Sequence, residues 1–293
     1  MSTIKTTIPA RIWAGVALAL AAAAGFAFSN ASAHVADIGG SNALTVAAMR
    51  FLVPSAALAA WLHLAGARLM LPGRDALIAA ILGIVTGLYT WALLTAFTRI
   101  PFALAVLIFY LFPLLAAVTV ALLGWEKLSW KTVTGLVLAF AGLALALNVG
   151  AGNLNIAGLG IAFLAAIGLA IVAVVSGRLL AKLDPRPVTL HMAAVACVEL
   201  LILCAVAGDF ALPKTQAGWI GFLASTALYG FAMIAFFIAI SIIGAVHTSL
   251  LSYAETIISA VLGVIVLGQA LTLVQIAGIA LVIAALAGTT LWK

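Results

Sequence analysis

The chain has 293 residues, of which 67% are hydrophobic and only 7% charged, whereas soluble proteins have roughly 45–50% apolar and about 25% charged residues. This composition excludes a soluble globular protein, because so few polar side chains cannot cover a water-facing surface. The formal net charge of +6 does not indicate a nucleic-acid partner, since the basic residues are spread over short segments between apolar runs.

Ten apolar runs predict ten membrane-spanning helices. A helix of about 18 or more residues crosses a hydrocarbon core of roughly 30 Å at 1.5 Å per residue. The spans must be helical, because lipid offers no hydrogen-bond partners to the backbone. In chain order we expect helices at 12–33, 43–65, 76–96, 101–123, 131–148, 156–179, 187–206, 217–240, 245–267 and 271–291. The expected fold class is therefore all-α and integral to the membrane.

The segments between the runs carry their basic residues asymmetrically. If the amino terminus is cytoplasmic, Arg99 and Lys214 lie outside and Arg50 lies within a span. The other basic residues lie on the cytoplasmic side: Lys5, Arg11, Arg68, Arg74, Lys127, Lys131, Arg178, Lys182, Arg186 and Lys293. This bias follows the positive-inside rule. It predicts cytoplasmic termini in a bacterial-type inner (plasma) membrane.

The second half of the chain aligns with the first at a single offset of 143 residues. Matched pairs include Gly25 with Gly168, Met49 with Met192, Gly87 with Gly230 and Tyr110 with Tyr253. Each half carries five spans, an odd number, so the second half is inverted in the membrane. We expect two inverted five-helix repeats, residues 1–148 and 156–293. Many secondary transporters have this architecture, with the substrate site near the midplane between the halves.

The amino-terminal segment has an alternative interpretation. Lys5 and Arg11, the apolar run and Ala31-Ser32-Ala33 together have the features of a cleavable secretory signal. The repeat favours an uncut first helix, because residues 14–28 match a span in the middle of the chain.

Short motifs resemble those of a known family. They are Ala48-Met49-Arg50-Phe51 early in the second span, Tyr110-Leu111-Phe112-Pro113 in the fourth, and Gly124-Trp125-Glu126-Lys127-Leu128-Ser129 after it. With five spans per half, they resemble the drug/metabolite transporter superfamily, specifically its EamA-like ten-helix exporters, and in particular bacterial aromatic amino-acid exporters. The resemblance implies an exporter of amino acids. The second half departs from the pattern, with Thr256 in place of Pro113 and Gln269 in place of Glu126.

The ninth span carries a polar stripe. Thr248, Ser252, Glu255 and Ser259 are spaced by four, three and four residues, which places them on one helical face. Glu255 lies roughly 15 Å into the span, near the midplane. The matching positions in the first half are Ala105, Phe109, Phe112 and Ala116. A cavity between these two faces would suit a solute with an ammonium group and an apolar side chain. The alternative is that the hydroxyls bond back to their own helix and hold helices together.

Aromatic residues with polar tips lie in the third, fourth, eighth and ninth spans. Tyr and Trp often anchor helices at the membrane surface, but Tyr110 and Tyr253 lie too deep for that role. The predicted substrate cavity comprises Glu255, Ser252, Thr248, Tyr253, Tyr110, Phe109, Trp91, Tyr89, Tyr229 and Asn30.

Two other charged residues, Arg50 and Glu199, each lie roughly 10 Å inside the outer surface. They either pair with each other or find separate partners, and a structural role is favoured over substrate contact for both. Cys197 and Cys204 are two helical turns apart, which excludes a disulfide between them and a metal pair. We expect no metal and no cofactor.

The favoured function is a secondary transporter that exports amino acids, aromatic or other neutral ones, or related metabolites by alternating access. A nucleotide-sugar or other metabolite or drug carrier of the same superfamily is the nearest alternative, although phosphate needs cationic partners. An intramembrane enzyme is a second alternative, but His-Glu-x-x-His, Gly-x-Ser-x-Gly and paired intramembrane aspartates are absent from the sequence, so no catalytic residues are expected. A channel would show filter sequences or rings of charge. The expected partners are a small solute and the lipid bilayer; the oligomeric state is open, and a monomer is compatible with the sequence.

Overall fold

The computed structural model describes residues 10–125, 127–148, 155–267 and 271–290, and all regular structure in these residues is helical. The elements are α1 Ala10–Ile38, α2 Ala43–Leu64, α3 Gly73–Phe97, α4 Phe102–Phe109, α5 Phe112–Leu122, α6 Trp130–Leu147, α7 Ile156–Leu180, α8 Pro185–Ala207, α9 Gln216–Ile243, α10 Ala245–Leu251, α11 Ala254–Leu267 and α12 Leu273–Thr290. Within these residues, nine apolar segments are long enough to cross a membrane, counting α4 with α5 and α10 with α11, and α12 is a shorter apolar helix. The all-α membrane fold is confirmed.

Polar residues mark where several helices begin. Asn42, Ser129, Asn155 and Thr215 each accept a hydrogen bond from a backbone N–H in the first turn of the helix that follows. Such caps satisfy N–H groups that have no partner within the helix. The helices therefore begin close to the positions that the sequence predicts.

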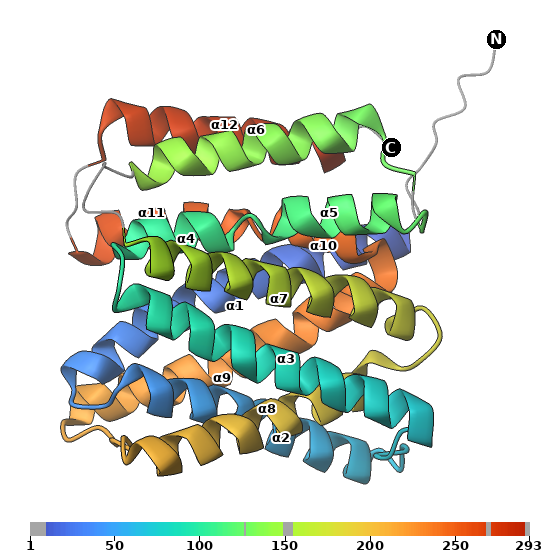
Figure 1. Cartoon of the computed structure of the whole chain (residues 1–293), viewed down its shortest axis with the longest axis vertical. Helices are drawn as coiled ribbons and strands as arrows, with labels where there is room; N and C mark the ends of the chain where they lie inside the picture. The colour runs from blue at the N-terminus through green and yellow to red at the C-terminus, as the bar shows by residue number, and fades with distance from the viewer. Residues whose placement is uncertain (1–9, 126, 149–154, 268–270, 291–293) are drawn as a thin grey trace.

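The helix ends gather at two opposite faces of the molecule, left and right in Figure 1. The loops after α2, α5 and α7 lie at the right-hand face with the start of α1, whereas the loops after α1, α3 and α8 lie at the left. The loops and helix ends on the right carry Arg11, Arg68, Arg74, Lys127, Lys131, Arg178, Lys182 and Arg186, while those on the left carry Arg99 and Lys214. Lys5, Glu126, Gln269 and Lys293 lie outside the described residues.

The fourth and ninth spans are each divided into two helices. The breaks lie at Tyr110–Leu111 and at Ser252–Tyr253, and at the offset of 143 residues they overlap at Tyr110 and Tyr253. Pro113 favours the first break, because it has no N–H for the carbonyl four residues earlier. At the second break, the N–H groups of Glu255 and Thr256 bond to carbonyls three residues back. Each break is thus a tight turn in the middle of a span, and the helical face predicted for Thr248 to Ser259 is interrupted.

The helix contacts repeat at the same offset. α1 packs on α9 as α7 packs on α3, α3 packs on α8 as α9 packs on α2, and α2 and α8 contact each other, as do α6 and α12. α6 and α12 meet at Gly142 and Gly278, where a Cβ atom on Gly142 would lie 2.8 Å from the Gly278 carbonyl oxygen. Small residues allow this approach of two backbones. The two halves are therefore related by a pseudo-twofold axis.

Candidate functional site

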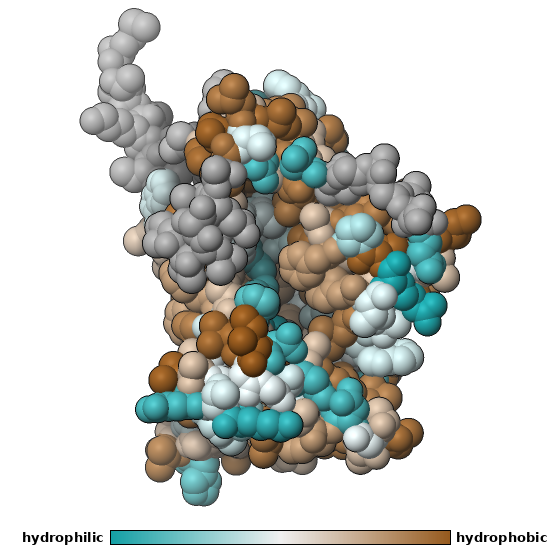
Figure 2. All heavy atoms as spheres, turned by 90° about the vertical axis from the view of Figure 1, so that its left-hand side faces the viewer, coloured by the Kyte–Doolittle hydropathy of each residue, from teal (hydrophilic) through white to brown (hydrophobic). Residues whose placement is uncertain are grey.

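The face at the left of Figure 1 is hollowed near its centre, and hydrophilic surface is visible inside the hollow (Figure 2). Asn30 of α1 is exposed although it lies eight residues, roughly 12 Å, from the end of its helix. Arg50 lies at a similar depth on α2, and Ser225 on α9. These three helices end at the same face, so residues far apart in sequence meet at one level within the span.

A network of hydrogen bonds joins these residues to Glu255. Arg50 donates from Nε to Ser225 Oγ at 3.0 Å, and from Nη2 to the Ser29 carbonyl and to Asn30 Oδ1, both at 3.1 Å. Asn30 Nδ2 in turn donates to Glu255 Oε1 at 2.9 Å. Glu255 lies in the first turn of α11, directly after the break, where the helix N-terminus favours a negative charge.

Arg50 and Glu255 do not form a direct ion pair. In the part of the chain that the structure describes, the one ion pair within 4.0 Å joins Arg186 and Asp184 at the start of α8. The Asn30 amide instead lies between the guanidinium and the carboxylate. A cation and an anion are thus held close together on two helices with an exposed amide between them.

Aromatic rings surround this network. The Arg50 guanidinium lies 5.3 Å from the centre of the Tyr229 ring, a favourable cation–π distance. The Tyr110 side chain lies close to Glu255, and that of Tyr89 lies close to Tyr229. Phe109 connects the two sides, with ring centres 6.1 Å from Tyr89 and 6.0 Å from Tyr110. The polar groups therefore have apolar ring surface beside them.

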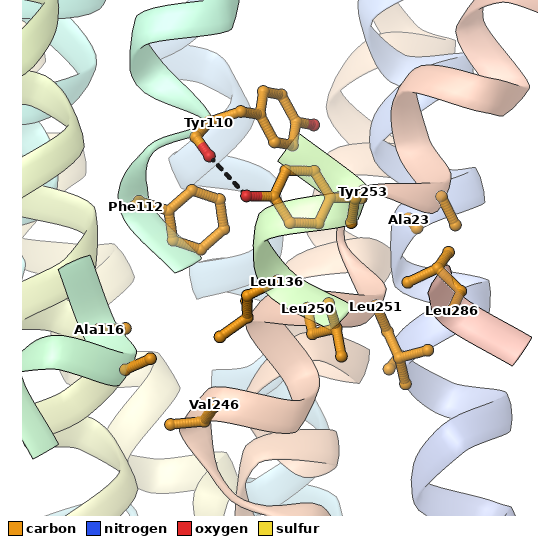
Figure 3. Packing of buried hydrophobic residues seen from close by; sticks show 14 of the residues in the cluster. Ala23, Tyr110, Phe112, Ala116, Leu136, Val246, Leu250, Leu251, Tyr253 and Leu286 are labelled. Carbon is orange, nitrogen blue, oxygen red and sulfur yellow. Dashed lines mark hydrogen bonds between the residues drawn. The ribbon is translucent and has the colours of Figure 1, made fainter. Parts of the chain in front are cut away.

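The two helix breaks contact each other directly. The Tyr253 hydroxyl donates to the Tyr110 carbonyl oxygen at 3.0 Å, as the dashed line in Figure 3 shows. Their rings lie 5.8 Å apart, and Tyr253 is fully buried. This hydrogen bond satisfies a carbonyl at the first break with a side chain from the second.

Replacing Tyr253 with Phe should therefore lower thermal stability, because the buried Tyr110 carbonyl loses its donor, at a cost of about 1–3 kcal/mol. Thermal unfolding of purified protein in detergent measures this. Thr95→Val is the matched control, since its hydroxyl bonds back to the Trp91 carbonyl of the same helix, away from the breaks. Equal unfolding temperatures for Tyr253→Phe and wild type would contradict this role.

Three residues of the predicted cavity lie apart from the network. Thr248 and Ser252 are buried, and their hydroxyls bond back to the carbonyls of Gly244 and Thr248, respectively. Trp91 is 45% exposed on α3. Of the predicted stripe, Glu255 alone joins the network: the break separates Thr248 and Ser252 from α11, and Ser259, one turn after Glu255, is exposed. The structure brings together Glu255, Asn30, Tyr110, Tyr253, Phe109, Tyr89 and Tyr229.

Arg50 and Glu199 have different surroundings. Arg50 belongs to the network, whereas Glu199 Oε2 is buried against Gly87 of α3 and has no hydrogen-bond partner among the described residues. Ser29 and Ser225 were not predicted as part of the site. A guanidinium within a span needs several hydrogen-bond acceptors. That requirement could have pointed to polar residues such as Ser29 and Ser225 at the depth of Arg50.

The repeat shows what the fold itself requires at these positions. At the offset of 143 residues, Asn30, Arg50 and Glu255 correspond to Ala173, Ala193 and Phe112, which are buried with at most 2% exposure. Equivalent packing is therefore achieved in the other half with apolar side chains. The three polar residues are not a requirement of the helix packing, which favours a functional role for them.

Comparisons with known proteins agree with this architecture. A model of the EamA-like transporter family matches the chain twice, at residues 13–148 and 156–291. A solved structure described only as "Crystal structure of protein" superposes with a TM-score of 0.80 at 22% sequence identity, covering 95% of this chain and 99% of that one. This likeness shows a shared fold. No curated protein matches the chain.

Proposed function

Because the chain belongs to the EamA-like transporter family, we propose that it is a secondary transporter that exports amino acids, aromatic or other neutral ones, or related small metabolites. The observation that carries this proposal is the pairing of Arg50 and Glu255 across the exposed Asn30 amide. A site for a zwitterion needs one cation, one anion and a short distance between them. Arg50 of α2 supplies the cation and Glu255 of α11 the anion, and both are hydrogen-bonded to the one Asn30 amide of α1.

The rings beside the network suit the side chain of such a substrate. Tyr229 lies next to Arg50, and Tyr110 next to Glu255, so both ends of the charged pair border aromatic surface. Apolar and aromatic surface with a few placed polar groups is typical of small-molecule sites. Phosphorylated cargo such as a nucleotide sugar fits less well, because Arg50 is the one basic residue of this network.

Transport would proceed by alternating access. In inverted-repeat transporters, broken helices border the substrate site, and one unit rocks against the other. The breaks at Tyr110 and Tyr253 occupy equivalent places in the two halves and contact each other. They supply the points at which α4 and α10 change direction relative to α5 and α11. Movement at these points would expose the network to one face and then to the other.

Counterflow into liposomes tests the proposed function. Purified protein is reconstituted with an excess of unlabelled L-phenylalanine inside, and uptake of labelled L-phenylalanine, L-leucine and a nucleotide sugar is measured. We expect transient accumulation of the two amino acids above equilibrium and none of the nucleotide sugar. Accumulation of the nucleotide sugar with unlabelled nucleotide sugar inside, and no amino-acid counterflow, would replace this proposal with the other carrier class.

We further propose that both termini are cytoplasmic in a bacterial inner membrane, because the basic residues are concentrated at one face. Fusions of a cytoplasm-active and a periplasm-active reporter to the carboxyl terminus should show activity of the first alone. A fusion after Arg99, whose loop lies at the opposite face, is the control and should show the reverse. The opposite pattern at both positions would invert the orientation.

A further inference from the structure

The Asn30 side chain makes the two contacts that an α-amino acid would make in this site. Its Nδ2 group donates to the carboxylate of Glu255, and its Oδ1 atom accepts from the guanidinium of Arg50. An amide presents donors at one end and an acceptor at the other. A zwitterionic amino acid has the same order of groups, with an ammonium donor beside a carboxylate acceptor.

The guanidinium does not depend on Asn30 for its position. Arg50 also donates to Ser225 Oγ and to the Ser29 carbonyl, and Ser29 Oγ donates to the Ser225 carbonyl at 2.8 Å. These contacts connect α1, α2 and α9 without the Asn30 amide. If Asn30 turned away, Arg50 would remain in place with part of its fork free for another acceptor.

Asn30 is free to turn away, because its side chain is exposed whereas its neighbour Ser29 is fully buried. The corresponding position in the other half is Ala173, which is also fully buried. Packing of the helix at this level therefore does not require an amide.

We propose that the Asn30 side chain takes the place of the substrate in this site. When no substrate is bound, the amide contacts Arg50 and Glu255, and an incoming α-amino acid displaces it. This inference rests on the proposed function, and it commits to substrates that carry both an ammonium and a carboxylate. A zwitterion replaces both hydrogen bonds of Asn30. An amine or a carboxylic acid replaces one and leaves the opposite charge without its partner, which is a costly state for a desolvated charge.

Equilibrium binding by calorimetry to the purified full-length protein tests this inference with three probes: L-phenylalanine, phenethylamine and 3-phenylpropionate. The wild type should bind L-phenylalanine at least about 30-fold more tightly than either analogue, because one unpaired charge costs about 2 kcal/mol or more. Asn30→Ala removes the competing amide. If the amide occupies the subsite about 70–90% of the time, Asn30→Ala should tighten L-phenylalanine binding about three- to tenfold.

The same substitution should tighten binding of the two analogues by about the same factor, because each of them must also displace the amide, so the preference for L-phenylalanine should remain. Asn155→Ala is the matched control: Asn155 caps α7 through the Gly158 N–H outside the site, and all three affinities should be unchanged. Asn30→Ser serves as a second variant, with the same expected direction, in case Asn30→Ala does not fold.

Three results would overturn the inference. L-phenylalanine binding weakened more than tenfold in folded Asn30→Ala and Asn30→Ser would make Asn30 a direct ligand of the substrate. Unchanged affinities for all three probes would show that the amide does not compete. A wild type that binds none of the probes and shows no amino-acid counterflow would overturn the proposed function itself, a result distinct from the other two.

Discussion

Replacing Arg50 with Gln should reduce counterflow of L-phenylalanine about 100-fold or more. The substrate carboxylate would lose its cationic partner, and loss of one member of a desolvated charge pair costs about 2–5 kcal/mol, which is about 30-fold to more than 1,000-fold in affinity. Arg50→Lys should retain part of the activity, because the charge remains but an ammonium cannot reproduce the planar fork that contacts Ser225, Ser29 and Asn30 together.

Initial counterflow rates per unit of folded protein in liposomes measure this effect. Arg99→Gln is the control, since Arg99 is exposed in the loop after α3 and should transport normally. Arg50→Gln that is folded and transports L-phenylalanine at the wild-type rate would show that the guanidinium only holds α1, α2 and α9 together. The carboxylate would then require a different partner.

Replacing Glu255 with Gln should raise the half-saturation concentration for L-phenylalanine about 30-fold, because the variant keeps an oxygen acceptor for Asn30 but loses the charge that attracts an ammonium. The maximal rate and the pH dependence of transport should change little if Glu255 acts only in binding. The measurement is counterflow over a range of substrate concentrations at several pH values.

Glu199→Gln is the matched control for Glu255→Gln, because Glu199 is the other Glu within a described span and lies against Gly87 outside the network. Its transport should equal that of the wild type. If transport by Glu255→Gln no longer depended on pH while exchange of labelled for unlabelled substrate was preserved, this carboxyl would instead carry a proton during transport. Unaltered transport by Glu255→Gln at every pH would remove Glu255 from the site.

The helices were predictable because their lengths are set by the thickness of the bilayer and their ends by loop residues. The second span was predicted at 43–65 and is Ala43–Leu64. The two breaks were not predicted, since the fourth and ninth runs are continuously apolar and a run of that kind does not distinguish one long helix from two short ones. Pro113 was a signal for the first break, but no proline marks the second, where Thr256 stands.

The site was predictable only in part, because the sequence does not show which face of each helix is turned toward which neighbouring helix. Glu255 and the deep tyrosines could be selected because ionisable and polar-tipped residues within spans usually face the protein interior. Depth alone could not decide the partner of Arg50. Glu199 lies at a similar depth but faces α3. The acceptors for the Arg50 guanidinium are instead supplied by Asn30 of α1 and Ser225 of α9, two other helices that α2 contacts. Such pairings depend on tertiary packing, which helical periodicity does not encode.

The unequal occupation of the two halves limits how a solute can lie in the molecule. If Asn, Arg and Glu stood at both sets of positions, a solute could bind in two equivalent poses related by the twofold axis. This chain has a single set, opposite Ala173, Ala193 and Phe112. If the proposed site binds an amino acid between Arg50 and Glu255, that amino acid would have one head-to-tail direction relative to the axis.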